Sequence, residues 1–343
     1  MHNRVFLLGA GFSCAISSEM PTMKDLSNAV EESIAAKGLP PIPGSGTAVS
    51  RNFEQWLSYL IESPPWLPES DQLRNRAAFN DVALAVHDVL VARQTAAVAN
   101  GACPDWLRKL VNYWEVRSST VITFNYDLFI DLVAIMNFPG KYGRTPGLIS
   151  VPDVISRAGT VSSVSGGQKG LRLLKLHGSL NWRYSGPGGN PGDVIYDMGL
   201  NGADGWSVSG IGPQDDDSER LLSDREPMIV PPAAVKSPYY NNRTLRALWM
   251  DSAQALRKAD ELVMMGFSLP VTDLLVASML TTNLPESATI VPVNYSGDVN
   301  ARVRDTFGLA EGVDDDRLVA TFADDDLKDA AIPSWVDRFA NLA

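Results

Sequence analysis

The chain has 343 residues, of which 45% are hydrophobic and 20% charged, a balance typical of a globular protein with a sizeable core. Its formal net charge is −11, and because binding to nucleic acid needs a basic surface, we expect no direct nucleic-acid contact. Two cysteines, Cys14 and Cys103, fit a reducing cytosol and exclude a four-cysteine zinc module, and three scattered histidines argue against a metal centre. No stretch reaches the length of a membrane-spanning helix, so we expect a cytoplasmic protein without membrane contact.

The N-terminal segment predicts a strand followed by a glycine turn. Arg4 to Leu8 is a short apolar run, and Gly9-Ala10-Gly11-Phe12-Ser13 follows it directly. Glycines there allow a sharp turn and close approach of a ligand, and a helix starting after the turn would direct N–H groups at a phosphate. The alternative is a tight strand-to-helix turn without a ligand, because Cys14 stands where a dinucleotide fingerprint has its third glycine.

A helical insertion is predicted at about residues 40–115. A loop rich in Gly and Pro, from Gly38 to Thr47, comes first, and apolar residues at helical spacing follow. The helices predicted before and within the insertion are Met23–Ala36, Phe53–Ile61, Ala77–Ala97 and Trp106–Trp114. His87 lies within the third of these helices, and we interpret it as a surface or core histidine.

Polar side chains follow two further predicted strands. Ser119 to Phe124 ends in Asn125-Tyr126-Asp127 before a helix over residues 128–136, and residues 171–176 end in His177-Gly178-Ser179. Open α/β sheets bind ligands at the carboxyl ends of their strands, so these side chains are candidate site residues. Asn125 and Asp127 could equally cap the following helix. A histidine at such a place can move protons near neutral pH.

The second half of the chain predicts strands and helices in alternation. Residues 138–170 and the acidic, glycine-rich excursion at about 184–226 are predicted as loops. The elements predicted after them are a strand at 228–230, a helix at 243–258, a strand at 261–265, the turn Gly266-Phe267-Ser268, a helix at 273–279 and a strand at 288–293 that ends at Asn294. This β-α-β-α-β order is the unit of a parallel sheet and predicts an α/β fold. An acidic tail follows, with Trp335 and Phe339 available to dock it.

Four of these segments together resemble the SIR2 (sirtuin-like) family. They are Gly9 to Ser13, Thr123 to Asp127, Lys175 to Ser179 and Gly266 to Ser268, and the resemblance spans residues 4 to about 295. It implies a Rossmann-like parallel sheet with helices on both faces that binds NAD, forming a catalytic domain over residues 1–300 with the tail at 301–343 docked on it.

The resemblance also implies a role for each candidate residue. Asn125 and His177 would be catalytic, with Asp127 beside Asn125 facing the nicotinamide and its ribose. The residues implied to bind the pyrophosphate, the other phosphates and the adenosine ribose are Gly9, Ala10, Gly11, Phe12, Ser13, Gly266, Ser268 and Asn294.

The chain departs from the deacylase members of that family. It has no four zinc cysteines, and Thr22-Met23-Lys24-Asp25 stands after Pro21 where those enzymes carry an Asp-Phe-Arg segment. In these departures it is similar to the zinc-less bacterial SIR2-like NADases of antiphage defence. The resemblance therefore implies an NAD⁺ hydrolase that releases ADP-ribose and nicotinamide without a metal. An NAD-dependent protein deacylase and a non-catalytic NAD or ADP-ribose sensor are the alternatives.

The same resemblance implies partners for the chain. A homo-oligomer is expected, because an unrestrained NADase would kill its host and this chain offers no obvious sensor domain. A separately encoded ATPase or nucleic-acid-sensing protein would then supply the trigger.

Overall fold

The frame of the molecule is a five-stranded parallel sheet with the strand order β11-β10-β1-β2-β4. Its strands are β1 (Arg4–Leu8), β2 (Thr120–Thr123), β4 (Arg172–Lys175), β10 (Glu261–Met265) and β11 (Thr289–Val293). From β4 the order is third, second, first, fourth, fifth, which is that of a Rossmann-like doubly wound sheet, and the prediction of that fold class is confirmed. The computed structural model describes residues 2–38, 52–62, 64–142, 155–157, 170–186, 188–190, 195–198, 200–201, 206, 210–211, 224–233, 236, 239–309, 317–319 and 330–339.

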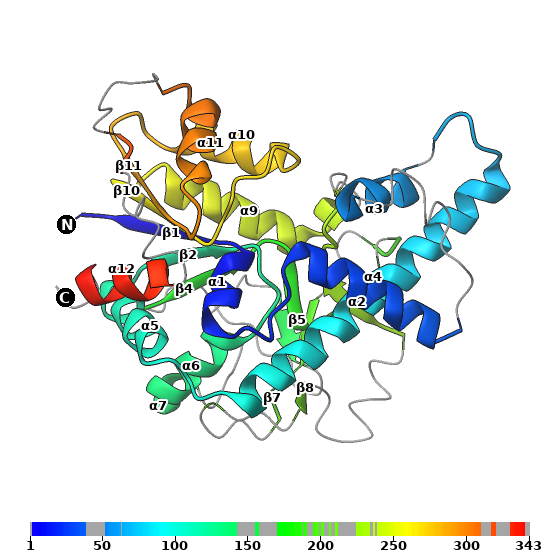
Figure 1. The fold of residues 1–343 in the computed structure, drawn as a ribbon, viewed down its shortest axis with the longest axis horizontal. Coiled ribbons are helices and arrows are strands. Elements are labelled where there is room, and N and C mark those ends of the chain that lie inside the picture. Colours follow the sequence, from blue (N-terminus) through cyan, green and yellow to red (C-terminus); the bar gives the residue numbers. More distant parts are fainter. Residues whose placement is uncertain are drawn as a thin grey trace.

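Helices cover both faces of this sheet (Figure 1). On one face lie α9 (Arg243–Leu256), α10 (Leu274–Asn283) and α11 (Asp298–Phe307), and on the other lie α5 (Asp105–Arg117), α6 (Phe129–Asn137) and α12 (Ala331–Phe339). A strand covered on both sides reads as a continuous apolar run, and Phe6, Leu7 and Leu8 are fully buried. This is why the strands of the parallel sheet were predictable.

The remaining helices stand beside the sheet. They are α1 (Ala10–Ile16), α2 (Met23–Ala36), α3 (Phe53–Ile61), α4 (Glu69–Asn100) and the short α7 (Pro139–Tyr142). Helix α4 packs against α2 and α3, and buries Phe79, Val82 and Val86. By length and composition α4 could cross a membrane, so the expectation that no stretch reaches that length is wrong. A core helix of a folded domain passes the same test, and length alone does not separate the two.

A second sheet, with strand order β3-β6-β5-β9, lies next to the first. It contains β3 (Ile155–Arg157), β5 (Gly178–Tyr184), β6 (Ile195–Asp197) and β9 (Glu226–Ile229), and a separate pair is formed by β7 (Leu200–Asn201) and β8 (Gly210–Ile211). The sequence analysis placed residues 228–230 in the parallel sheet, which is wrong, because β9 pairs antiparallel with β5. Strand β5 itself was not predicted. Gly178, with φ of +86°, redirects the chain from β4 into this second sheet.

The C-terminal residues pack along the first sheet. Leu318 forms a parallel bridge with Ile290 of β11, and Trp335 of α12 is buried against Phe6 and Phe339. Most of the predicted loop from Gly38 to Thr47, most of the excursion at 184–226 and the acidic runs at 314–316 and 324–326 lie outside the described residues.

Candidate active site

The candidate residues follow strands whose carboxyl ends are aligned. The last residues of β11, β10, β1, β2 and β4 pair in one row: Val293, Met265, Leu8, Thr123 and Lys175. Asn294, Gly266 and Gly9 follow directly, and Asn125 and His177 each lie two positions beyond the row. Residues that are far apart in sequence therefore lie along one edge of the sheet, where doubly wound folds bind their ligands.

The two glycine turns meet at the crossover between β1 and β10. A Cβ on Gly9 would lie 2.7 Å from the carbonyl oxygen of Gly266, and one on Gly266, whose φ is +61°, would lie 2.1 Å from the nitrogen of Phe12. The N–H of Gly11 donates to Gly266 O at 2.9 Å. The glycines thus let the backbones of the two turns touch, and the N–H of Gly11 is used in this contact.

Three other predicted ligand residues are used in different ways. The ring of Phe12 is buried against Trp106 and Trp114 in the core. The Nδ2 of Asn294 donates to Phe267 O at 3.3 Å, so this side chain supports the second glycine turn. Ser268 is exposed, and its carbonyl oxygen accepts from Arg302. Contact of these residues, and of the exposed Ala10, with a ligand stays a prediction.

Asn125 has a fixed orientation. Its Nδ2 donates both to Gly9 O at 2.8 Å and to Ser13 Oγ at 2.9 Å, while its main-chain N–H donates to Thr123 Oγ1. A backbone carbonyl can only accept, so the amide nitrogen must face Gly9. Within the described part of the chain no donor reaches Oδ1. Asn125 therefore presents a hydrogen-bond acceptor.

Asp127 ends this chain of hydrogen bonds. The hydroxyl of Ser13, which accepts from Asn125, donates to Asp127 Oδ2 at 2.5 Å. Burial raises the pKa of the Asp127 carboxyl, while the hydrogen bond from Ser13 and the positive charge of Lys175 lower it. The turn after β2, which carries Asn125 and Asp127, is also held by the helical insertion. Gln94 Oε1 of α4 accepts the N–H of Leu128 at 2.6 Å.

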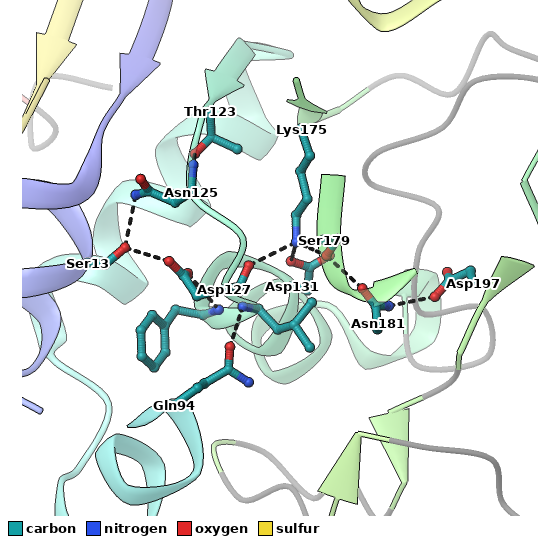
Figure 2. Close-up of polar contacts among 12 residues, drawn as sticks. Ser13, Gln94, Thr123, Asn125, Asp127, Asp131, Lys175, Ser179, Asn181 and Asp197 are labelled. Atoms are coloured by element: carbon teal, nitrogen blue, oxygen red, sulfur yellow. Dashed lines mark hydrogen bonds and ion pairs between the residues drawn. The ribbon is translucent and has the colours of Figure 1, made fainter. Parts of the chain in front are cut away.

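Lys175 lies at the centre of a buried polar network (Figure 2). Its Nζ lies 2.9 Å from Asp127 O, 2.9 Å from Ser179 Oγ and 2.8 Å from Asp131 Oδ2. Ser179 in turn donates to Asn181, which donates to Asp197 of β6 at 2.5 Å. The network joins the edge of the parallel sheet to the second sheet.

His177 is buried in an aromatic cluster and is held neutral. Its side chain is 5% exposed, its ring centroid lies 4.9 Å from that of Phe124 and 6.4 Å from that of Tyr126, and Nε2 has no hydrogen-bond partner within the described ranges. Burial and then the positive charge of Lys236 lower the pKa of His177 well below its usual value. Lys236 forms an ion pair with Asp273, directly before α10.

Sequence reasoning missed Lys175, Asp131 and Lys236 as candidate site residues. Lys175 and Asp131 each stand alone as a charge within an apolar run, Leu173 to Leu176 and Phe129 to Ile135, and each is buried. A lone charge in such a run indicates a buried partner. Lys236 lies between stretches of no clear pattern, and we see no sequence signal for it.

The described residues contain no group of three or more His, Cys, Asp and Glu side chains that could hold a metal. The two cysteines favour the protonated thiol, because burial raises the pKa of Cys14 and raises that of Cys103 to about 11. A protonated thiol is a poor metal ligand.

No protein-family model matches the chain, and no curated protein sequence matches it. Similar solved structures include a Sir2 homologue in complex with NAD, with 14% identity and a TM-score of 0.41, covering 98% of this chain and 90% of that chain. Another is a mutant Sir2 homologue in complex with ADP-ribose, with 13% identity and a TM-score of 0.42, covering 99% of this chain and 94% of that chain.

Proposed function

We propose that the chain is an NAD⁺ hydrolase that cleaves the bond between nicotinamide and ribose. Two independent features support this: the four SIR2-like motifs in the sequence, and the alignment that brings the residues of those motifs to one edge of the sheet. The observation that carries the proposal is the pairing of Thr123 with Lys175. Because Thr123 and Lys175 pair, Asn125 and His177 each lie two residues beyond the ends of neighbouring strands.

The reaction needs few groups from the protein. The C1′–N bond breaks, nicotinamide leaves as a neutral molecule, and a water adds to C1′ and releases one proton. The positive charge of the oxidised nicotinamide makes it a leaving group, so the protein's part is to orient the ribose and the water and to take up the proton.

Asn125 and His177 suit these two tasks. The free Oδ1 of Asn125 can accept a hydrogen bond from a ribose hydroxyl or from the water. Neutral His177 has an Nε2 without a hydrogen-bond partner in the described part of the chain, and this atom can accept the proton of either. Such proton transfer contributes about 10²- to 10⁴-fold in rate. The glycine crossover at Gly9 and Gly266 and the side chain of Ser13 would adjoin the pyrophosphate.

The test is chromatography of NAD⁺ incubated with the purified protein, with thermal melting of each variant in parallel. We expect free nicotinamide without any acyl-peptide, and its loss in folded His177→Ala and Asn125→Ala proteins. His2→Ala is the matched control, because His2 is exposed near the opposite edge of the sheet, beside Glu261. Nicotinamide release only with an acyl-peptide would indicate a deacylase, and tight binding of intact NAD⁺ a sensor. Full activity in folded His177→Ala would refute the assignment.

The proposal extends to the biological role. We infer NAD⁺ depletion in the cytoplasm of a bacterium during antiviral defence, by a homo-oligomer under the control of a separately encoded ATPase or nucleic-acid sensor. The support is the motif resemblance and the acidity of the chain, which disfavours direct sensing of nucleic acid. Phage challenge of cells that carry the wild-type or the His177→Ala gene tests it, and equal protection by both would refute it.

A further inference from the structure

We propose that Lys175 is a positioning residue for this reaction, whose buried ammonium holds the turn carrying Asn125 and Asp127 at a fixed height beside His177. The inference rests on the proposed NAD⁺ cleavage and adds to it a residue that touches no reacting atom.

Two hydrogen bonds and one ion pair surround the ammonium. Nζ donates to Asp127 O and to Ser179 Oγ, each at 2.9 Å, and forms an ion pair with Asp131 Oδ2 at 2.8 Å. They come from the turn after β2, from β5 and from α6, as Figure 2 shows. Lys175 itself ends β4, two residues before His177. One side chain therefore joins the strand end of His177 to the turn of Asn125.

A packing role alone does not explain this ion pair. Lys175 and Asp131 are 2% and 3% exposed, and an apolar pair of similar volume is often as stable as a buried ion pair. Apolar side chains would fill the space between β4 and α6. They could not donate to the main-chain oxygen of Asp127, a contact that holds the turn from the side of β4 as Gln94 holds it from the side of α4.

The same ammonium acts on the state of Asp127. Its positive charge lowers the pKa of the Asp127 carboxyl, and this effect is larger than the opposite effect of Asp131. Burial raises the pKa of Asp127 more than Lys175 lowers it, and the carboxyl accepts the hydroxyl of Ser13, which in turn accepts from Asn125. Lys175 thereby supports the hydrogen-bond chain that leaves Oδ1 of Asn125 free.

The experiment compares two replacements with a control. Lys175→Met leaves Asp131 as an unpaired buried charge, so we expect a fall in Tm on the order of 10 °C together with loss of activity. Lys175→Met/Asp131→Leu leaves no unpaired charge and should recover most of the Tm. Its kcat should still fall about 10²-fold with little change in KM, because the catalytic groups are misplaced. Lys109→Met, which removes an exposed ion pair with Asp337, is the control.

A second readout separates positioning from stability. The acid limb of the pH–rate profile should move to higher pH in the double variant. The positive charge of Lys175, which lowers the pKa of Asp127, is lost together with the smaller opposing effect of Asp131. A double variant that regains wild-type kcat and pH profile along with its Tm would overturn the proposal. Failure of the proposed function itself would appear earlier, as a wild-type protein that releases no nicotinamide.

If the double variant does not fold, Ser179→Ala replaces it. This change removes one acceptor of Lys175 and the donor to Asn181 without leaving a charge unpaired, and we expect a fall in kcat of about tenfold with a smaller fall in Tm than in Lys175→Met. Wild-type kcat in folded Ser179→Ala would then overturn the assignment.

Discussion

Replacing Gly9 with alanine tests whether the first glycine motif serves the contact between two backbones. The φ and ψ of Gly9, −122° and −175°, are extended values that any residue adopts, so alanine adds no backbone strain. Its Cβ would lie 2.7 Å from both Gly266 O and Phe267 Cα, where ordinary contact begins at 3.4 Å. The two turns must separate by several tenths of an ångström, and overpacking of this kind costs about 1–3 kcal/mol.

Alanine substitutions at three other glycines separate the stability cost of a crowded Cβ from the cost of a strained backbone conformation. Among the described residues nothing lies within 4 Å of a Cβ placed on Gly297, whose φ is −65°, or on Gly308, whose φ is +64°. Alanine should stabilise the protein by about 0.4–1 kcal/mol at Gly297 and destabilise it by about 1–2 kcal/mol at Gly308. Gly266 is both crowded and at positive φ, so its replacement should cost above about 3 kcal/mol.

Denaturant unfolding of the four variants, with equal m values, gives these free energies. NAD⁺ turnover is measured on the same samples, and we expect it to fall for Gly9→Ala and to stay unchanged for Gly297→Ala. If Gly9→Ala is as stable as Gly297→Ala, the close approach is not the reason for the glycine. In that case the crossover has room for a side chain, and our account of the first motif is refuted.

The remaining predictions concern pH and metal. Because the folded pKa of His177 is well below that of the unfolded chain, only the unfolded state takes up the proton as pH falls below about 6.5. Stability should then fall by up to about 1.4 kcal/mol per pH unit, and His177→Phe should flatten this slope in denaturant unfolding. An unchanged slope would mean that the ring is protonated in the folded protein. EDTA should change neither Tm nor turnover, since the cysteines favour their protonated form; stoichiometric zinc in elemental analysis would contradict this.

The strand ends were predictable because of how a doubly wound sheet is covered. Its strands are largely buried on both faces, so they read as mainly apolar runs that stop where the polar residues of the candidate site begin. Asn125, His177 and Gly266 could be located in this way. Strand β5 of the second sheet was missed although Ser179 to Tyr184 alternates polar and apolar residues, which is the period of a strand. Its polar residues Ser179 and Asn181 are buried in the network around Lys175, so the alternation does not mark a solvent-exposed face.

The partners of buried charges were also beyond sequence reasoning. Lys175 and Asp131 are visible as lone charges in apolar runs, yet they lie far apart in the sequence, so no helical or strand periodicity links them. Only the pairing of β2 with β4 brings α6 next to the end of β4. A sequence can therefore indicate that a buried partner exists before the topology indicates which residue it is.

The chemical role of Asn125 depends on a glycine that lies 116 positions away. From the sequence, an amide at a strand end can donate, accept or cap a helix. The carbonyl of Gly9 and the hydroxyl of Ser13 take both of its N–H groups, which leaves an acceptor. That carbonyl is in place because Gly9 has no side chain to push β1 away from the Gly266 turn. The glycine motif and the asparagine motif therefore act together, because the close backbone contact at Gly9 determines the orientation of the Asn125 amide.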